Sequence, residues 1–109
     1  MAWLMREGEV LASAEVAASL GARLRGLVGR DSCDGVLVIM KAKSVHTFGM
    51  RFPIDVAFCD RELTVLATTT MRRARLGRPR LRARCVVEAE AGAFERWQLR
   101  PGDHLEITG

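Results

Sequence analysis

Residues 46–58, HTFGMRFPIDVAF, contain the two residue types in this chain that are best suited to acid–base chemistry. His46 carries an imidazole, which titrates near neutral pH. Asp55 places a carboxylate inside the apolar run that follows Pro53. If the chain folds back at Gly49, the two side chains meet and could act as a general acid and a general base. His46 and Asp55 are therefore the candidate catalytic residues.

A carboxylate in a buried strand must be hydrogen-bonded or paired with a cation, because an isolated buried charge is strongly destabilising. Arg51 and Arg30 are the expected partners of Asp55. The favoured interpretation is structural, with Asp55 holding a turn or a neighbouring segment of backbone. The other is a pocket in which Asp55 acts as a base or binds a cationic or polyol ligand. The candidate ligand-binding residues are Asp55, His46, Thr47, Arg51 and Arg30.

The segment 72–84, RRARLGRPRLRAR, holds seven arginines and no acidic residue. Because the whole chain carries a net charge of +4, the other residues sum to about −3. Arginine clusters can bind the phosphates of nucleic acid or of an acidic membrane surface. The segment lacks the aromatic residues that stack on single-stranded bases, so a solvated surface loop is favoured over nucleic-acid binding. The candidate anion-binding residues are Arg72, Arg73, Arg75, Arg78, Arg80, Arg82 and Arg84.

The cysteines Cys33, Cys59 and Cys85 are widely spaced and form no C-x-x-C pair. We therefore expect buried, reduced thiols, with no metal site and no cofactor. Arg6 and Glu7 interrupt the apolar N-terminus before the core of a signal peptide can form. No run approaches the ~20 apolar residues that a membrane span requires. These features favour a cytoplasmic location.

Apolar periodicity and turn residues predict mainly β structure. A short helix is expected between Ser19, a suitable N-cap, and Gly29, a suitable C-terminal glycine. A second helical turn is expected at 94–99, followed by a tight turn at 100–103. The predicted strands are 10–17, 35–40, 54–59, 63–70, 84–88 and 104–108, with 54–70 as a hairpin.

Alternation along these strands predicts which side chains share a face. Ile54, Val56 and Phe58 are expected on one face of their strand, with Asp55 on the other. The carboxylates Glu88 and Glu90 alternate on one face of the strand that begins near residue 84, and Asp103 belongs to the 100–103 turn. For these acidic residues, hydrogen bonds within a turn or at the edge of a sheet are the expected explanation.

The chain length of 109 residues fits one domain with one hydrophobic core. Its composition, 49% apolar and 28% charged, is that of an ordinary globular protein. The predicted fold class is mainly β (α+β), a small antiparallel barrel- or sandwich-like sheet with one or two short helices. We expect a single domain over 1–109 with a basic loop at 71–84.

Five short motifs occur in one order along the chain. They are GLVGR at 26–30, GVLV at 35–38, PID at 53–55, VVE at 86–88 with AG at 91–92, and GD at 102–103. This order resembles the domain-of-unknown-function family 192, a set of small bacterial and archaeal proteins, from about residue 10 to residue 107. Where that family commonly has Phe-Trp-Met-Lys-Asn-Thr, this chain has VHTFGM at 45–50. The resemblance implies a fold and no particular activity.

The sequence contains no recognisable nucleophile–base pair, phosphate-binding loop or metal constellation. The favoured hypothesis is a non-catalytic ligand-binding or accessory domain with a surface around His46 and Asp55, beside the basic loop. Its partner would be a small molecule or a protein. One alternative is a small hydrolase-like enzyme that uses His46 and Asp55 as an acid–base pair. The other is a nucleic-acid-associated protein that acts through residues 72–84.

Overall fold

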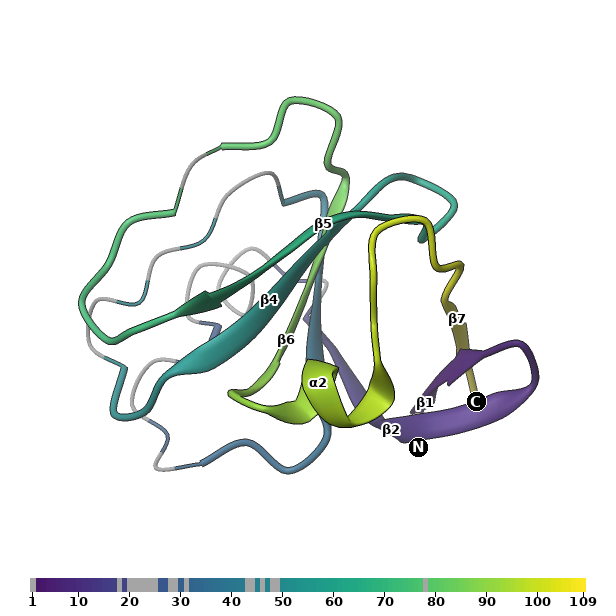
Figure 1. Ribbon diagram of the computed structural model, residues 1–109, viewed down its shortest axis with the longest axis horizontal. Helices are drawn as coiled ribbons and strands as arrows, with labels where there is room; N and C mark the ends of the chain where they lie inside the picture. The colour runs from purple at the N-terminus through teal and green to yellow at the C-terminus, as the bar shows by residue number, and fades with distance from the viewer. Residues whose placement is uncertain are drawn as a thin grey trace.

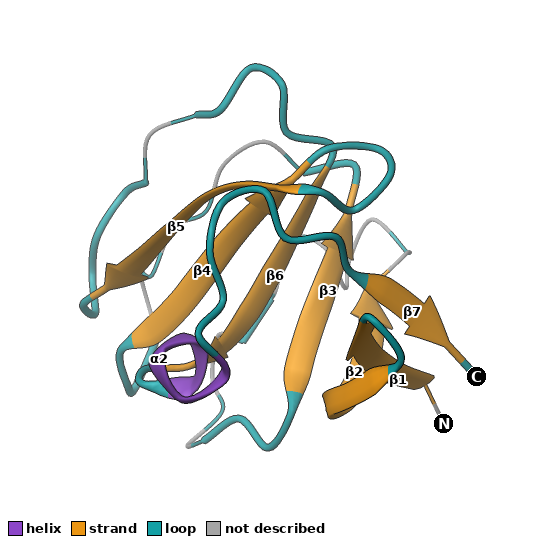
Figure 2. Cartoon of the chain, turned by 45° about the vertical axis from the view of Figure 1, so that its right-hand side comes forward, coloured by secondary structure: helices purple, strands orange, loops and turns teal. Residues whose placement is uncertain are grey.

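The computed structural model of the protein describes residues 2–17, 19, 26–27, 30, 32–42, 45, 47, 50–77 and 79–109. These residues form one twisted sheet with a short helix at one end (Figures 1 and 2). The helix is α2 (Ala93–Trp97). The strands are β1 (Ala2–Arg6), β2 (Glu9–Ala17), β3 (Val36–Met40), β4 (Ile54–Cys59), β5 (Val65–Met71), β6 (Cys85–Glu90) and β7 (Glu106–Thr108). The mainly β fold class is therefore confirmed.

The strand order across the sheet is β5-β4-β6-β3-β2-β1-β7. All neighbouring strands are antiparallel except β2 and β3, which run parallel. Gly35, immediately before β3, has a φ of +83°, and a Cβ there would collide with Ser13 of β2. Only glycine fits this position without strain, which explains the glycine at the start of the GVLV motif.

The sheet does not close into a barrel, and its two edge strands are β5 and β7. Near one end the two edges approach each other, because Thr64 forms an isolated bridge with His104. The N–H of Val65 donates to the carbonyl of Asp103 at 2.8 Å, and the N–H of Leu105 donates to the carbonyl of Leu63 at 3.0 Å. The architecture is therefore a curled, sandwich-like sheet, one of the two forms that the sequence predicts.

Each face of the sheet carries its own hydrophobic core. The core on the face of α2, here called the helix-side core, includes Leu4, Val38, Cys59, Val87 and Phe94. The opposite core, the loop-side core, includes Leu27, Leu37, Val56, Phe58 and Val86. Neighbouring residues of β4 alternate between the two cores, as the sequence predicts. Central strands are thus buried on both faces.

The predicted strands 10–17, 35–40, 84–88 and 104–108 correspond to β2, β3, β6 and β7, and the predicted hairpin corresponds to β4 and β5. The sequence does not predict β1, which becomes a strand by pairing with β2 and β7. The predicted helix between Ser19 and Gly29 lies largely outside the described residues. No helix in the described part of the chain is long and apolar enough to cross a membrane.

Candidate functional site

Asp55 lies on β4, with its carboxylate on the helix-side face of the sheet, and is only 3% exposed. Its Oδ1 accepts a hydrogen bond of 2.6 Å from the hydroxyl of Thr70 on β5. Its Oδ2 accepts from the backbone N–H groups of Gly92 at 3.0 Å and Phe94 at 3.1 Å. Both carboxylate oxygens are therefore engaged by donors that lie far away in the sequence.

These bonds make Asp55 the cap of helix α2. The N-cap residue of α2 is Gly92, which has no side chain to accept from the first N–H groups of the helix. Asp55 supplies that acceptor from the neighbouring strand. A hollow of about 350 Å³ adjoins the carboxylate, lined also by Thr68 and Glu95. The contacts seen at Asp55 are those of a residue that holds a neighbouring segment of backbone.

The three hydrogen bonds described for Asp55 come from Thr70, Gly92 and Phe94, and not from the arginines expected as its partners. The guanidinium of Arg30 forms a 2.7 Å ion pair with Glu15. Arg51 is exposed in the bend before β4. His46 lies outside the described residues, so the His46–Asp55 pair stays a prediction.

Thr47 is fully buried and contacts the basic loop. Its hydroxyl donates to the carbonyl of Arg72 at 2.5 Å and accepts from the N–H of Arg75 at 2.6 Å. Its own N–H donates to the carbonyl of Arg75 at 2.7 Å, and its carbonyl accepts from Ala74 at 2.9 Å. A third backbone bond, from the N–H of Gly77 to the carbonyl of Val45 at 2.7 Å, extends this contact. The first half of the basic loop is thus fixed against the bend.

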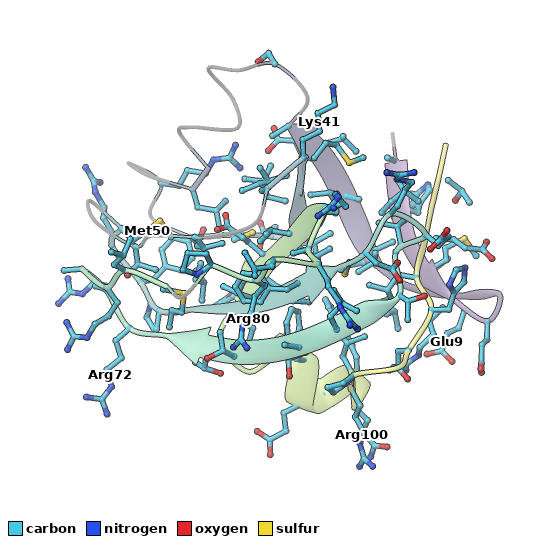
Figure 3. All side chains as sticks on the ribbon, turned by 90° about the horizontal axis from the view of Figure 1, so that it is seen from above. Glu9, Lys41, Met50, Arg72, Arg80 and Arg100 are labelled. Atoms are coloured by element: carbon cyan, nitrogen blue, oxygen red, sulfur yellow. The ribbon has the colours of Figure 1, made fainter. Side chains whose placement is uncertain are left out.

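The basic loop follows β5 and returns to β6 as a wide excursion, green along the left and upper part of Figure 1. Its described arginines, in 72–77 and 79–84, are all exposed. Arg78 lies outside the described residues. Figure 3 shows Arg72 extending away from the ribbon at the end of β5.

Three of these arginines surround one hollow, here called the arginine cavity. Arg72, Arg75 and Arg80 line it, and its volume is about 540 Å³. Phe58 of β4 and Met71 and Thr69 of β5 form the rest of its wall with Thr70, Leu76 and Gly77. The guanidinium carbon of Arg80 lies 5.4 Å from the centre of the Phe58 ring, within the range of a cation–π contact. Among the described residues that line the cavity, none is acidic.

Glu88 is a buried carboxylate for which the sequence-based prediction of a sheet-edge position is wrong. It lies on β6 between Leu37 of β3 and Val56 of β4, and it is 3% exposed. The expectation of a carboxylate at a sheet edge is wrong, because β6 is paired on both sides. An acid flanked by apolar residues within a strand is the feature that singles out Asp55, and Glu88 has it too, between Val87 and Ala89.

The carboxyl of Glu88 has an unusual setting on the loop-side face. Within the described part of the chain, its Oε1 has no hydrogen-bond partner. A Cβ at Gly26 would lie 3.4 Å from this oxygen, so Gly26 packs against it. Burial raises the pKa of Glu88 from 4.5 to about 7, and the positive charge of Arg30 opposes part of this rise. Glu88 can therefore gain or lose a proton near neutral pH.

The three cysteines are free and buried, as predicted. Burial raises the pKa of Cys33 and of Cys85 to about 11, and that of Cys59 to about 12. Protonated thiols are poor nucleophiles and poor metal ligands. In the described ranges, no three Cys, His, Asp or Glu side chains converge as a possible metal site.

Comparison with known proteins identifies the family. The model of the domain-of-unknown-function family DUF192, described as uncharacterized ACR, matches residues 2–107. The chain belongs to the DUF192 family. Two UPF0127 proteins, from Pyrococcus abyssi and Pyrococcus horikoshii, are each 30% identical to it over 105 residues. The aligned region covers 92% of this chain and 86% and 88% of those relatives.

Solved structures share the DUF192 fold seen here. A protein of unknown function from Novosphingobium aromaticivorans superposes with a TM-score of 0.79 at 16% identity, covering 96% of this chain and 82% of that one. A candidate transcription regulator from Sinorhizobium meliloti gives a TM-score of 0.72 at 21% identity, covering 97% and 91%. At these identities the likeness establishes the fold, and the chemistry must be argued from the residues.

Proposed function

We propose that this DUF192 protein is a non-catalytic binding protein, and that it holds a small phosphate- or carboxylate-bearing molecule in the arginine cavity. The observation that carries the proposal is the charge of the cavity wall. Arg72, Arg75 and Arg80 line a volume of about 540 Å³, and the other lining residues that the structure describes include no acid. Charges of one sign around a concave surface attract the opposite charge and raise its local concentration.

The chemistry of the wall fits an anion with an apolar part. A guanidinium presents several N–H donors in one plane and can bind a carboxylate or phosphate through two parallel hydrogen bonds. The Thr69 hydroxyl adds a neutral donor, and Phe58 and Met71 add apolar surface. The cavity volume lies within the roughly 300–1,000 Å³ that is common for small-molecule sites. A compact organic phosphate or polycarboxylate could contact the guanidinium groups, the hydroxyl and the apolar surface together.

The backbone contacts of Thr47 support this proposal. Its hydroxyl and amide hold the main chain at Arg72 and Arg75, whose side chains line the cavity. Two of the three arginines therefore start from a fixed backbone, which lowers the entropic cost of closing around a ligand. The bend and the basic loop act as one unit in this proposal, with Thr47 as the residue that positions it.

Binding of pyrophosphate to the full chain, measured by isothermal titration calorimetry, tests the proposal. We expect Arg75→Ala and Arg80→Ala each to weaken binding by roughly 10- to 150-fold, because each removes a charge-assisted contact worth roughly 1.5–3 kcal/mol. Arg73→Ala and Arg82→Ala are matched controls, since they remove the same charge from the same loop without lining the cavity. We expect these two to change affinity by less than about threefold.

The same four variants separate this proposal from its alternatives. If all four variants lose the same pyrophosphate affinity, and if binding to a nucleic-acid duplex decreases steeply as salt is raised, the arginines bind nucleic acid diffusely and the cavity is not a specific site. Absence of pyrophosphate binding by the unmodified chain would end the proposal. The acid–base hypothesis receives no support from Asp55, since Thr70, Gly92 and Phe94 already donate to its carboxylate.

A further inference from the structure

A second hollow, here called the apolar groove, opens on the helix-side face. Its volume is about 710 Å³, and its wall includes Val16 of β2, Met40 of β3, Leu63 and Ile107 of β7. Leu63 and Ile107 also pack against the helix-side core, so the groove is continuous with that core. Val16 and Met40 remain 42% and 37% exposed. Exposed apolar side chains that gather around a concavity mark a binding surface.

The position of the groove follows from the curled sheet. Cys85, the first residue of β6, lines it, whereas α2 follows the last residue of β6. The groove and α2 therefore lie toward opposite ends of β6, and Figure 2 shows α2 at the lower end of that strand. The groove is therefore formed at the end of the curled sheet opposite α2, and clefts of this kind are common sites for small molecules.

The groove also has a basic rim. Lys41, Arg61 and Arg84 line it together with one acid, Asp60. The N–H of Lys41 donates to the carbonyl of Arg84 at 2.7 Å, which sets these two cationic residues next to each other. Asp60 is engaged in its own turn, where its Oδ1 accepts from the N–H groups of Glu62 and Thr64 at 2.9 Å each. The rim therefore favours an anionic group.

We infer that the apolar groove binds a medium-chain fatty acid anion, with its alkyl chain along Val16 and Met40 and its carboxylate between Lys41 and Arg84. The apolar wall formed by Val16, Met40, Leu63 and Ile107 fits an alkyl chain, and the basic rim fits a negative charge at its end. The inference does not depend on the arginine cavity, because none of Arg72, Arg75 and Arg80 lines the groove.

Titration of the full chain with octanoate, decanoate and dodecanoate, each below its micelle-forming concentration, tests the inference. We expect saturable binding whose affinity rises by about fourfold for each added methylene until the groove is filled. Decanol, which has the same chain without the charge, should bind about three- to fivefold more weakly than decanoate. Pyrophosphate at saturating concentration should leave decanoate binding unchanged.

Two valines of β2 provide a matched pair of variants. Val16→Trp places a large side chain in the groove, and we expect it to weaken decanoate binding by at least about tenfold. Val10 is 53% exposed on the same strand and does not line the groove, so Val10→Trp should bind decanoate within about twofold of the unmodified chain. Circular dichroism establishes that both variants are folded.

Substitutions at the rim test the polar half of the inference separately. Lys41→Gln combined with Arg84→Gln should remove the preference for decanoate over decanol and leave decanol binding intact. Equal binding of decanoate by the Val16→Trp and Val10→Trp variants would overturn the inference. An affinity that does not depend on the length of the alkyl chain would also overturn it. A third contrary result would be that decanoate does not bind and that the chain instead forms a concentration-dependent dimer, which Val16→Trp abolishes.

Discussion

Asp55 and Glu88 are both buried carboxylates, yet their surroundings give them different chemistry. They lie on the adjacent strands β4 and β6 and point to opposite faces of the sheet. Asp55 receives three hydrogen bonds from a hydroxyl and two backbone N–H groups. In the described residues, Oε1 of Glu88 receives none. Hydrogen-bond donors stabilise the charged form of a carboxylate, and burial without donors favours the protonated form.

This contrast predicts how stability responds to pH in Glu88→Gln. The pKa of Glu88 is raised from 4.5 to about 7 in the folded protein, so folding favours its protonated form. The stability that Glu88 contributes is complete below pH 4.5, decreases as pH rises through 7, and then stays at its lower level. Glutamine cannot ionise. The variant should therefore match the unmodified chain near pH 4 and exceed it by roughly 3 kcal/mol above pH 8.

Urea unfolding between pH 4 and pH 9 measures this difference. Glu90→Gln is the matched control, because Glu90 lies on the same face of the same strand but is exposed. We expect that control to show no comparable dependence on pH. A constant difference between Glu88→Gln and the unmodified chain across the range would contradict a raised pKa.

At the scale of elements, α2 depends on the sheet for its start. The helix has five residues, and helices of this length are unstable alone in water. Its cap Gly92 offers no side-chain acceptor, and the carboxylate of Asp55 fills that role from β4. Phe94 and Ala93 then pack into the helix-side core. One carboxylate thus connects a central strand, an edge strand and the helix.

Asp55→Ala should therefore destabilise the protein and loosen α2. The substitution leaves the N–H groups of Gly92 and Phe94 without their acceptor, at a cost of about 2–4 kcal/mol in the free energy of unfolding. Hydrogen exchange should accelerate at these two amides more than in β3. Asp60→Ala is a control, because Asp60 also accepts from two backbone N–H groups but in a more exposed turn. A similar loss in the free energy of unfolding for Asp55→Ala and Asp60→Ala would show that burial of the Asp55 carboxylate does not add to its effect.

At the scale of the whole molecule, the sheet separates two cores, and cysteines lie in both. Cys33 belongs to the loop-side core, and Cys59 and Cys85, paired in register across β4 and β6, belong to the helix-side core. Their thiols are buried, and their pKa values of about 11 to 12 keep the reactive thiolate scarce at pH 8. The rate at which these thiols react therefore measures how fast the whole protein unfolds.

We expect all three thiols to react with a thiol reagent such as Ellman's reagent only as fast as the protein unfolds. The native protein at pH 8 should show slow labelling, and the chain in concentrated guanidinium should show rapid labelling of every cysteine. Ser32→Cys places a thiol at an exposed position and should label at once in the native state. Rapid native labelling of one original cysteine would show that its core opens locally.

The sequence by itself determined the local structure and the family. Strict alternation over 54–59, proline at the start of that strand and turn residues at 60–62 predict β4 and its hairpin, because side-chain direction and turn geometry depend on neighbouring residues. It also predicts buried thiols and a basic surface loop. The order of five motifs indicates the DUF192 family, which the family match confirms.

Only the tertiary structure decided which strand lies beside which, and most of the candidate chemistry depends on that. The alternation that places Glu88 on one face cannot reveal that β6 lies between β3 and β4, where the side chain is buried. The donors to Asp55 lie 15, 37 and 39 residues away. The arginine cavity and the apolar groove likewise join residues that no local pattern connects. Local periodicity sets the face of a side chain, and strand order sets its neighbours.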